Sequence, residues 1–302
     1  MFINEETLKL EYQVESKEKG LKVIDVIASH MHISSRLIRK CKSNHNILLN
    51  QKKTSVNQIV SKGDIITLML DHDENTFEPN PIEIDIAFEN ADMMAINKPP
   101  FLVVHPTKGH PEGTLANAIS YYQYRSNQNF KTRFINRLDR DTSGIVLIAK
   151  SAYAQQFISE QMQKDEVDKI YYAVVEGVVS EDKGTINAPI ERAEDGDILR
   201  VVRPDGLPSI THYEVAERFN GYSLLKVKLE TGRTHQIRVH LAHIGHGIVG
   251  DHLYGKCSDW IDRQALHCFE MSFRKPRGNE RIVVNASLPE DIRKLIEVLR
   301  NL

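Results

Sequence analysis

The sequence predicts an α+β protein with two domains, a small N-terminal module and a larger C-terminal domain. The chain has 302 residues, and a domain averages about 150 residues. Residues 71–81 are acidic and interrupted by two prolines, so they are expected to connect two folded units. Strand-like and helix-like hydrophobic patterns follow one another both before and after this segment. We therefore expect a first domain at residues 1–75, a linker at 76–81 and a second domain at 82–302.

The composition is that of a globular protein without a membrane span. Hydrophobic residues make up 41% and charged residues 26% of the chain, and the formal net charge is −2. The whole protein is therefore no polycation, and nucleic-acid binding must come from local basic patches. No apolar run reaches the ~20 residues needed to cross a bilayer, and the N-terminus lacks a signal-peptide pattern. The three cysteines lie far apart, which fits a reducing compartment, so we expect a cytoplasmic protein.

The first domain carries a strong positive bias. Residues 26–63 contain seven Lys or Arg and no Asp or Glu. Ser34 and Ser35 are suitable caps for a helix, and two strands are expected within residues 47–53 and 60–68. One face of this module is therefore expected to be basic. The candidate RNA-binding side chains are Arg36, Arg39, Lys40, Lys52 and Lys53.

The second domain alternates strands and helices. Ile82, Ile84 and Ile86 alternate with acidic residues, which predicts a half-buried strand at the start of the domain. The unbroken apolar run at residues 145–149 predicts a buried strand. The remaining hydrophobic patterns predict strands at 169–177 and 222–229, and helices at 151–164, 234–244 and from Pro289 to Leu299.

Charged residues are concentrated directly before the apolar run at 145–149. Residues 137–141 read Arg-Leu-Asp-Arg-Asp, and a Ser-Gly turn pair leads into the run. A carboxylate such as Asp139 is thus expected at the edge of a core, where it is partly desolvated. Arg137 or Arg140 is close enough in sequence to set its charge state. The alternative is a solvated loop whose acids and arginines pair on the surface.

Three motifs resemble those of the RluA/RluD-type RNA pseudouridine synthases. Residues 136–144 match the family signature His-Arg-Leu-Asp-x-x-Thr-Ser-Gly, except that Asn136 stands where histidine is usual. The Lys-x-Tyr-x-Ala pattern at 169–173 resembles the second motif, and residues 231–240 match the third, Thr-Gly-Arg-Thr-His-Gln-Ile-Arg-Val-His. The Leu-His pair at 266–267 resembles a late element of the family. The chain is therefore identified as a member of this family over most of its second domain.

The resemblance implies a fold and the roles of individual side chains. The implied fold of the second domain is α+β, with a large mixed, mainly antiparallel sheet flanked by helices. The implied catalytic residues are the carboxylate of Asp139, its cationic partner Arg238, the active-site tyrosine Tyr171 and the apolar wall residue Leu266. Substrate contacts are expected from Arg137, Arg140, Arg233 and Gln236.

The first domain resembles the alpha-L RNA-binding domain, which was first known from a ribosomal small-subunit protein. The shared features are the basic helix, the polar turn and the following strands, although residues 43–46 stand where a glycine is usual. The resemblance implies a small α/β module that presents basic side chains to structured RNA. The alternative is a folded basic surface without a partner.

The reaction that the resemblance implies is the isomerisation of uridine in RNA to pseudouridine. The base leaves its nitrogen link to ribose, turns, and rejoins the sugar through carbon 5. A paired base cannot reach a protein pocket, so the nucleotide must be flipped out. A carboxylate can stabilise or capture the positive charge that develops on the sugar. The sequence leaves open whether Asp139 attacks the anomeric carbon or assists loss of a sugar proton. No cofactor and no metal are expected, because the reaction has no redox step.

The expected partner is structured RNA, with ribosomal RNA favoured and transfer RNA still open, and the chain is expected to act as a monomer.

Two other functions remain as alternatives. A non-catalytic RNA-binding or ribosome-assembly protein would share the basic module. His240 and His243 lie three residues apart on an expected helix and would suit a metal hydrolase, but supporting acids and cysteines are missing nearby. Lys98 and His105 are either RNA contacts or residues of a proline-rich turn.

Overall fold

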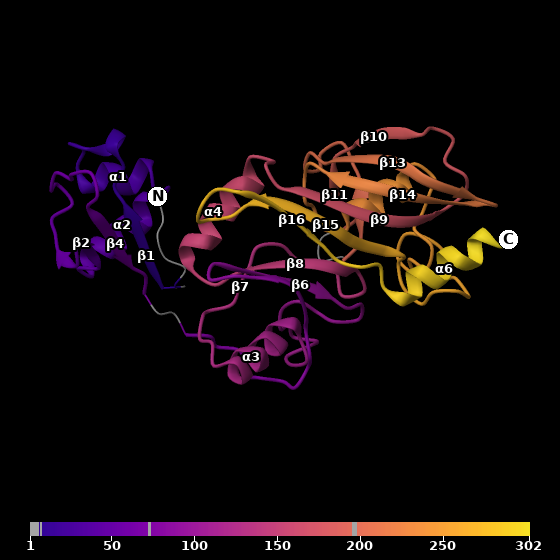
Figure 1. Ribbon diagram of the computed structural model, residues 1–302. Helices are drawn as coiled ribbons and strands as arrows, with labels where there is room; N and C mark the ends of the chain where they lie inside the picture. Colours follow the sequence, from indigo (N-terminus) through magenta and orange to yellow (C-terminus); the bar gives the residue numbers. More distant parts are fainter. Residues whose placement is uncertain (1–5, 7, 72–73, 195–197) are drawn as a thin grey trace.

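The computed structural model describes residues 6, 8–71, 74–194 and 198–302. Residues 72 and 73, which the sequence assigns to the end of the first domain, lie outside the described part. Two clusters of buried hydrophobic residues organise the rest, and each has its own sheet. The N-terminal cluster lies at one end of the molecule and the C-terminal helix at the other (Figure 1).

The N-terminal part folds around a four-stranded sheet. Its elements are β1 (Lys9–Gln13), a 3-10 turn (Ser16–Glu18), α1 (Val23–Ser29), α2 (Ser35–Ser43), β2 (Ile47–Leu49), β3 (Lys52–Lys53) and β4 (Ile65–Met69). The strand order is β1-β4-β2-β3. The predicted start of α2 is confirmed, because the Ser34 hydroxyl accepts a hydrogen bond of 3.2 Å from the backbone N–H of Leu37. Strand β2 falls inside its predicted range, and β4 begins inside its range and ends one residue beyond it, at Met69.

A second sheet of ten strands forms the frame of the remaining chain. Its strands are β5 (Asp85–Glu89), β6 (Met93–Lys98), β7 (Arg133–Phe134), β8 (Ser143–Ala149), β9 (Asp168–Glu176), β10 (Lys183–Asn187), β13 (Ile210–Phe219), β14 (Tyr222–Leu229), β15 (Leu266–Arg274) and β16 (Arg281–Asn285). The main order is β10-β13-β14-β9-β15-β8-β6-β5, with β16 paired to β15 and β7 paired to β8. Only the β8–β15 pairing is parallel among these pairs. The predicted large mixed, mainly antiparallel sheet is confirmed.

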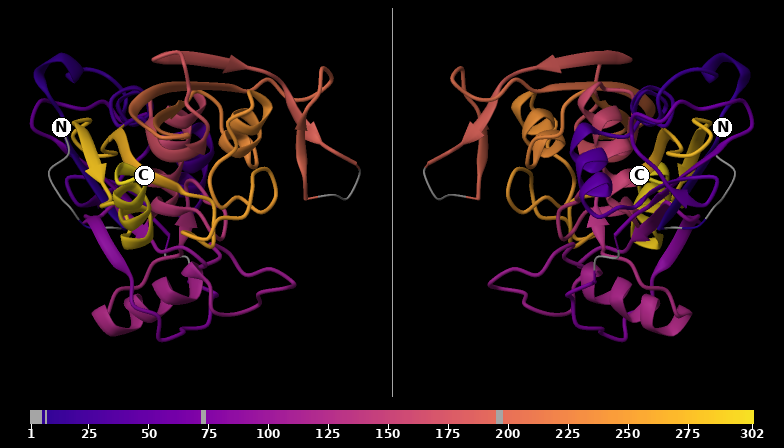
Figure 2. Two further views of the ribbon diagram at one scale, coloured as in Figure 1. Left: turned by 90° about the vertical axis from the view of Figure 1, so that its right-hand side faces the viewer. Right: turned by 90° about the vertical axis from the view of Figure 1, so that its left-hand side faces the viewer.

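Four helices and a small hairpin complete the second part of the chain among the described residues. They are α3 (Leu115–Ser126), α4 (Ala152–Gln163), α5 (Gln236–His243), α6 (Glu290–Arg300) and the paired strands β11 (Ile190–Arg192) and β12 (Arg200–Val202). The hairpin of β11 and β12 projects from the body of the protein (Figure 2). We call this hairpin the arm. No helix in the described ranges is long and apolar enough to span a membrane.

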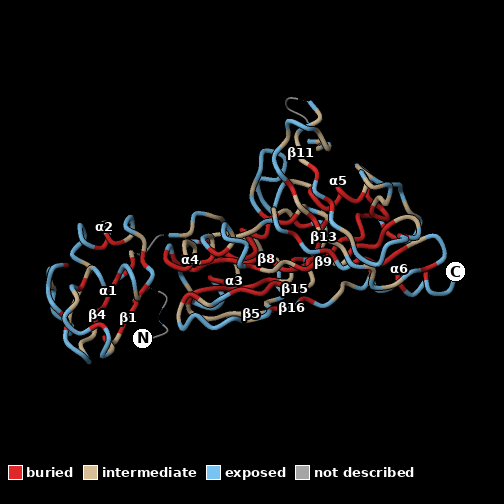
Figure 3. The backbone as a smooth tube through the Cα atoms, turned by 90° about the horizontal axis from the view of Figure 1, so that it is seen from above, coloured by how far each residue is buried: buried red, intermediate tan, exposed pale blue. Residues whose placement is uncertain are grey.

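The central strands of the large sheet are buried, as their hydrophobic residues predicted. All seven residues of β8 are buried, as the apolar run predicted. Figure 3 shows buried backbone concentrated along β8, β9 and β15. Gly144 lies at the start of β8 with φ +113°, and a Cβ there would overlap the backbone of Cys268 on β15. Glycine is therefore required for the close approach of these two strands, directly after the charged loop.

Two predicted boundaries were wrong. The strand expected from Ile82 begins at Asp85, where pairing with Asn97 of β6 starts, so the preceding isoleucines contact the core without joining the sheet. The helix expected from Thr234 begins at Gln236, because His235 has a left-handed backbone with φ +58° and cannot continue a right-handed helix.

The proposed linker, residues 76–81, and Asn75 directly before it contact α3. The Asn75 amide donates hydrogen bonds to Ser120 and Gln123 of α3, at 2.6 and 2.7 Å. The Asn117 amide of the same helix donates to the carbonyl of Glu78 at 2.8 Å. This segment therefore lies along α3. In addition, Tyr153 of α4 is buried in the N-terminal hydrophobic cluster.

Candidate active site

The loop between β7 and β8 is anchored to β8 by a side chain. The Asn136 amide donates to the carbonyl of Ile145 at 3.1 Å, and its oxygen accepts from the N–H of Leu147 at 2.8 Å. These two bonds imitate the pairing of a neighbouring strand. Asparagine is therefore able to fix this loop in place of the usual histidine, and the loop presents Asp139 beside the first residues of β8.

The carboxylate of Asp139 lies beside a buried guanidinium. Arg238 of α5 donates from Nη1 to Oδ2 of Asp139 at 3.0 Å. The same side chain donates from Nε and Nη2 to the two oxygens of Asp251, each at 2.7 Å. Asp251 has no exposed side-chain surface, whereas the side chain of Asp139 is 25% exposed. Asp251 thus holds Arg238 by a bidentate pair, while Asp139 remains accessible from outside.

The electrostatics keep this arginine charged. Burial alone would lower the pKa of the Arg238 guanidinium, but hydrogen bonds and charge attraction from Asp251 and Asp139 raise it above its usual value. Arg238 is therefore a permanent cation. It is placed to stabilise the ionised form of the neighbouring carboxylate.

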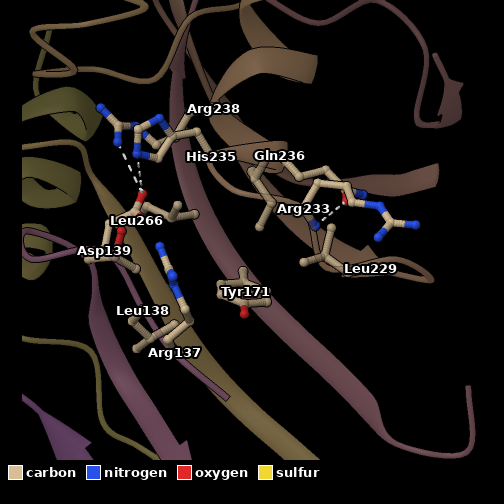
Figure 4. Close-up of a pocket in the computed structure, with 12 residues that line it drawn as sticks. Arg137, Leu138, Asp139, Tyr171, Leu229, Arg233, His235, Gln236, Arg238 and Leu266 are labelled. Atoms are coloured by element: carbon tan, nitrogen blue, oxygen red, sulfur yellow. Dashed lines mark hydrogen bonds and ion pairs between the residues drawn. The ribbon is translucent and has the colours of Figure 1, made fainter. Parts of the chain in front are cut away.

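Asp139 and Arg238 line a small cavity of about 70 Å³ that is open at its mouth (Figure 4). Seven of the predicted site residues meet there, although they come from widely separated parts of the chain. The lining residues are Arg137, Leu138, Asp139, Thr142, Tyr171, Leu229, Arg233, His235, Gln236, Ile237, Arg238 and Leu266.

Tyr171 and Leu266 form an apolar wall of the cavity. Tyr171 lies on β9 and Leu266 at the start of β15, and both are almost fully buried. Burial, with smaller contributions from Cys268 and Asp139, raises the pKa of the Tyr171 phenol well above its usual value. The phenol is therefore protonated at physiological pH. Its ring offers a flat apolar face to the cavity.

The loop before α5 is organised by Gln236. Its amide oxygen accepts from the Thr231 hydroxyl at 2.8 Å and from the backbone N–H of Arg233 at 3.0 Å. Its amide nitrogen donates to Ile210 and Thr211 of β13. All of these partners belong to the protein, so Gln236 fixes the shape of the loop. The exposed guanidinium of Arg233 donates from Nε to the carbonyl of Pro208 at 3.3 Å.

Arg140 and Lys98 lie outside the cavity. Arg140 forms a bidentate pair with the neighbouring carboxylate of Asp141, at 2.7 and 3.0 Å. Lys98 is fully buried, so it makes no RNA contact in this conformation. Its ammonium nitrogen donates to the carbonyls of Pro99, Leu102 and Arg140 at 2.8 to 3.0 Å. Lys98 therefore ties the loop that carries Asp139 to the turn after β6.

The basic candidates of the N-terminal part of the chain lie on α2 and β3. The side chains of Arg36, Arg39, Lys52 and Lys53 are exposed. Lys40 is exposed as well, and its ammonium pairs with Asp71 at 2.9 Å. These residues belong to the N-terminal sheet and cluster, so none of them lines the cavity.

One of the two histidines that raised a metal hypothesis, His240, has other partners. His240 is fully buried; its Nδ1 lies 2.8 Å from the Thr211 hydroxyl and its Nε2 lies 2.9 Å from the carbonyl of Ala188. No group of three or more His, Cys, Asp or Glu able to hold a metal occurs in the part of the chain that the structure describes.

Three residues near the carboxylate had no assigned role from the sequence. They are Asp251, His235 and Tyr254. His235 lies in the third motif, residues 231–240, and this signal pointed to the region. It did not show which side chain reaches Arg238, because that contact exists only in the folded chain.

Comparisons with known proteins show which family the chain resembles. The RNA pseudouridylate synthase family matches residues 92–243. The uncharacterized RNA pseudouridine synthase YhcT of Bacillus subtilis is 37% identical over 296 residues, which cover 97% of this chain and 98% of that protein. The ribosomal large subunit pseudouridine synthase D of Haemophilus ducreyi is 40% identical over 242 residues, or 76% of this chain and 74% of that protein.

A solved structure extends the likeness to the fold. Human RNA pseudouridylate synthase domain containing 1 superimposes with a TM-score of 0.56 at 26% identity, and the match covers 75% of this chain and 98% of that one. Matching sequence over nearly the whole length and a matching fold lead to one assignment. The chain belongs to the RNA pseudouridylate synthase family and is an RNA pseudouridine synthase of the RluA/RluD type.

Proposed function

We propose that the chain isomerises specific uridines of structured RNA to pseudouridine in the cavity around Asp139. One observation carries this proposal. The carboxylate of Asp139 is partly exposed inside a cavity, 3.0 Å from the buried cation of Arg238. A group that must meet a positively charged sugar has to be ionised and accessible, and this arrangement provides both.

The proposed reaction balances within the substrate. The bond between nitrogen 1 and the anomeric carbon breaks, and a bond between carbon 5 and the anomeric carbon forms. Carbon 5 loses its proton, and nitrogen 1 gains one. Asp139 acts either by attacking the anomeric carbon or by taking a proton from the sugar. No electron leaves the substrate, so the proposed reaction requires neither a cofactor nor a metal.

The walls of the cavity suit a flipped base. The ring of Tyr171 offers a surface on which a pyrimidine can stack, and Leu266 beside it keeps water from the detached base. Flipping costs about a few kcal/mol of lost stacking and pairing. Phosphate contacts from Arg137 and Arg233 at the cavity offset this cost, and Arg140 on the adjoining loop adds a further cation.

We further propose that the first domain, residues 1–75, recruits the RNA. Its exposed side chains Arg36, Arg39, Lys52 and Lys53 supply the phosphate contacts, and Lys40 adds to their positive field. Large-subunit ribosomal RNA is the proposed substrate. The support for it is the similarity to the ribosomal large subunit pseudouridine synthase D of Haemophilus ducreyi.

The direct test uses RNA that carries tritium at carbon 5 of uridine. The proposal predicts that the full chain releases tritium from ribosomal RNA of cells that lack it. Mapping pseudouridines across total RNA with and without the protein then identifies the site. Release from transfer RNA alone would contradict the proposed substrate, and no release from any RNA would contradict the proposed activity.

A further inference from the structure

A line of polar contacts connects the arm to the carboxylate of Asp139. The backbone N–H of Arg200 on β12 donates to the hydroxyl of Tyr254 at 2.8 Å. The same hydroxyl lies 2.8 Å from Nδ1 of His235, and Nε2 of His235 lies 3.8 Å from Oδ2 of Asp139. Figure 4 shows the imidazole of His235 directed toward Asp139 beside the guanidinium of Arg238.

The contacts limit where the proton of the Tyr254 hydroxyl can go. A backbone N–H is only a donor, so the Tyr254 oxygen accepts the bond from Arg200. The single hydroxyl proton is then available for Nδ1 of His235. Burial, together with the cations Arg238 and Arg200, lowers the pKa of His235 despite the nearby carboxylates of Asp139 and Asp251. A neutral ring whose Nδ1 accepts from the Tyr254 hydroxyl carries its proton on Nε2, the nitrogen that faces Asp139.

Both residues are held in place by further features. His235 adopts the left-handed conformation with φ +58°, which is unfavourable for a residue with a Cβ and is found where the surroundings impose it. The ring of Tyr254 packs against the guanidinium carbon of Arg238 at 5.0 Å. Tyr254 thus contacts Arg238 with its face and His235 with its hydroxyl.

The arm adjoins the cavity through a second hollow. Arg192 and Arg200 of the arm line this hollow together with Arg233, which also lines the first cavity. Three guanidinium groups around one hollow favour the phosphates of an RNA strand. Glu191 in the same hollow offsets part of this charge. An RNA whose uridine enters the cavity therefore passes the strand whose backbone is bonded to Tyr254.

We propose that His235 and Tyr254 are a positioning pair, which orients the carboxylate of Asp139 through the Nε2–H of His235 and links it to the arm. This inference rests on the function proposed for Asp139. The distance of 3.8 Å is longer than a hydrogen bond. Contacts of this kind tighten in the substrate complex. RNA bound along the arm shortens the distance between Nε2 of His235 and Oδ2 of Asp139, because Arg200 contacts Tyr254 and Tyr254 contacts His235.

The first test measures which nitrogen of the His235 imidazole carries the proton, and it does not depend on turnover. Nitrogen-15 NMR of histidine-labelled full-length protein, assigned with His235→Gln, is expected to show the proton of His235 on Nε2. In Tyr254→Phe, which keeps the ring against Arg238 but loses the hydroxyl, this preference is expected to disappear. A proton on Nδ1 in the unmodified protein, or no change in Tyr254→Phe, would overturn the pairing.

The second test measures coupling during the reaction. Misplacing a reacting group by about 1 Å costs up to about 100-fold in rate. We expect His235→Gln and Tyr254→Phe each to lower kcat by about 10- to 100-fold with little change in KM. The double variant is expected to be no slower than the slower single variant. The exposed residues Tyr124 and His110 provide the controls Tyr124→Phe and His110→Gln, which are expected to retain full activity.

The outcomes separate this inference from the proposed function. Independent, multiplicative losses in the double variant, or unchanged kcat in either single variant, would contradict a positioning pair while leaving Asp139 in its role. Absence of tritium release in the unmodified protein would contradict the proposed function instead, and the NMR result would still report whether the pair exists.

Discussion

Arg238 donates a hydrogen bond of 3.0 Å to Asp139, although the two residues are 99 positions apart in the chain. The other two polar contacts of its guanidinium go to Asp251, a fully buried carboxylate. The planar guanidinium of Arg238 therefore binds two carboxylates that have different roles. Asp251 fixes the direction of the guanidinium, and Asp139 stays partly exposed for chemistry.

Replacing Arg238 by lysine is expected to remove most of the activity. An ammonium is a point charge on a flexible stem and cannot donate in parallel to Asp251 while it reaches Asp139. We expect kcat to fall by about 100-fold or more, since the carboxylate loses its fixed partner. Tritium release under single-turnover conditions measures this effect. Activity of Arg238→Lys near that of the unmodified protein would contradict the geometry.

Asp251→Asn is expected to destabilise the fold. The substitution removes the bidentate carboxylate from a buried cation, and breaking a buried pair in this way costs about 3–5 kcal/mol. Urea unfolding followed by circular dichroism gives the change in the free energy of unfolding.

Asp205→Asn provides the matched control. Asp205 pairs with Arg203 at 2.6 Å, and its side chain is 68% exposed. A surface pair contributes about 0–1 kcal/mol. Equal losses in the two variants would mean that the Asp251 pair is no more important than a surface contact.

The buried ammonium of Lys98 is expected to give stability a pH dependence. Burial lowers its pKa to about 7 in the folded protein, against 10.5 for an exposed lysine. Between these values the unfolded chain binds the additional proton, so stability rises as pH increases from about 7 to about 10.5. The gain is at most about 1.4 kcal/mol per pH unit.

The Lys98→Met variant isolates this contribution. It removes the titrating group, and it also leaves the carbonyl of Arg140 without its donor, so lower stability at every pH is expected. The difference between the two proteins is expected to widen as pH rises through this range. A difference that does not change between pH 7 and pH 10 would contradict the assignment.

The basic face of the first domain is expected to govern the salt dependence of RNA binding. Each lost phosphate contact lowers the slope of log K against log salt concentration by about 0.7–0.9. Lys52→Ala with Lys53→Ala is therefore expected to reduce the slope by about 1.5. Lys294→Ala on α6, which removes an exposed lysine paired with Glu290, is the control. An unchanged slope in the double variant would exclude these lysines from the interface.

Predictions from the sequence were best where a hydrophobic pattern coincided with one element. Residues 222–229 form β14 at the predicted bounds, and α4 and α6 lie within one or two residues of theirs. The charged loop before β8 was also identified, since an abrupt change from charges to buried apolar residues requires no tertiary information.

The missed features depend on contacts across the chain. No pattern predicted α3, because its buried face carries Asn117, Ser120 and Gln123, whose polar groups bond to residues of the adjoining segment. A hydrophobic period cannot reveal such a helix. Asp251 was missed for a related reason: only the folded chain places it against Arg238.

The most direct test of the role of Asp139 compares Asp139→Ala with Asp141→Ala. Asp141 is two residues away and pairs with Arg140 outside the cavity, so it is a matched control on the same loop. We predict that Asp139→Ala abolishes tritium release from RNA labelled at carbon 5 of uridine, with RNA affinity nearly unchanged, and that Asp141→Ala retains turnover. Substantial release by Asp139→Ala would contradict the central claim.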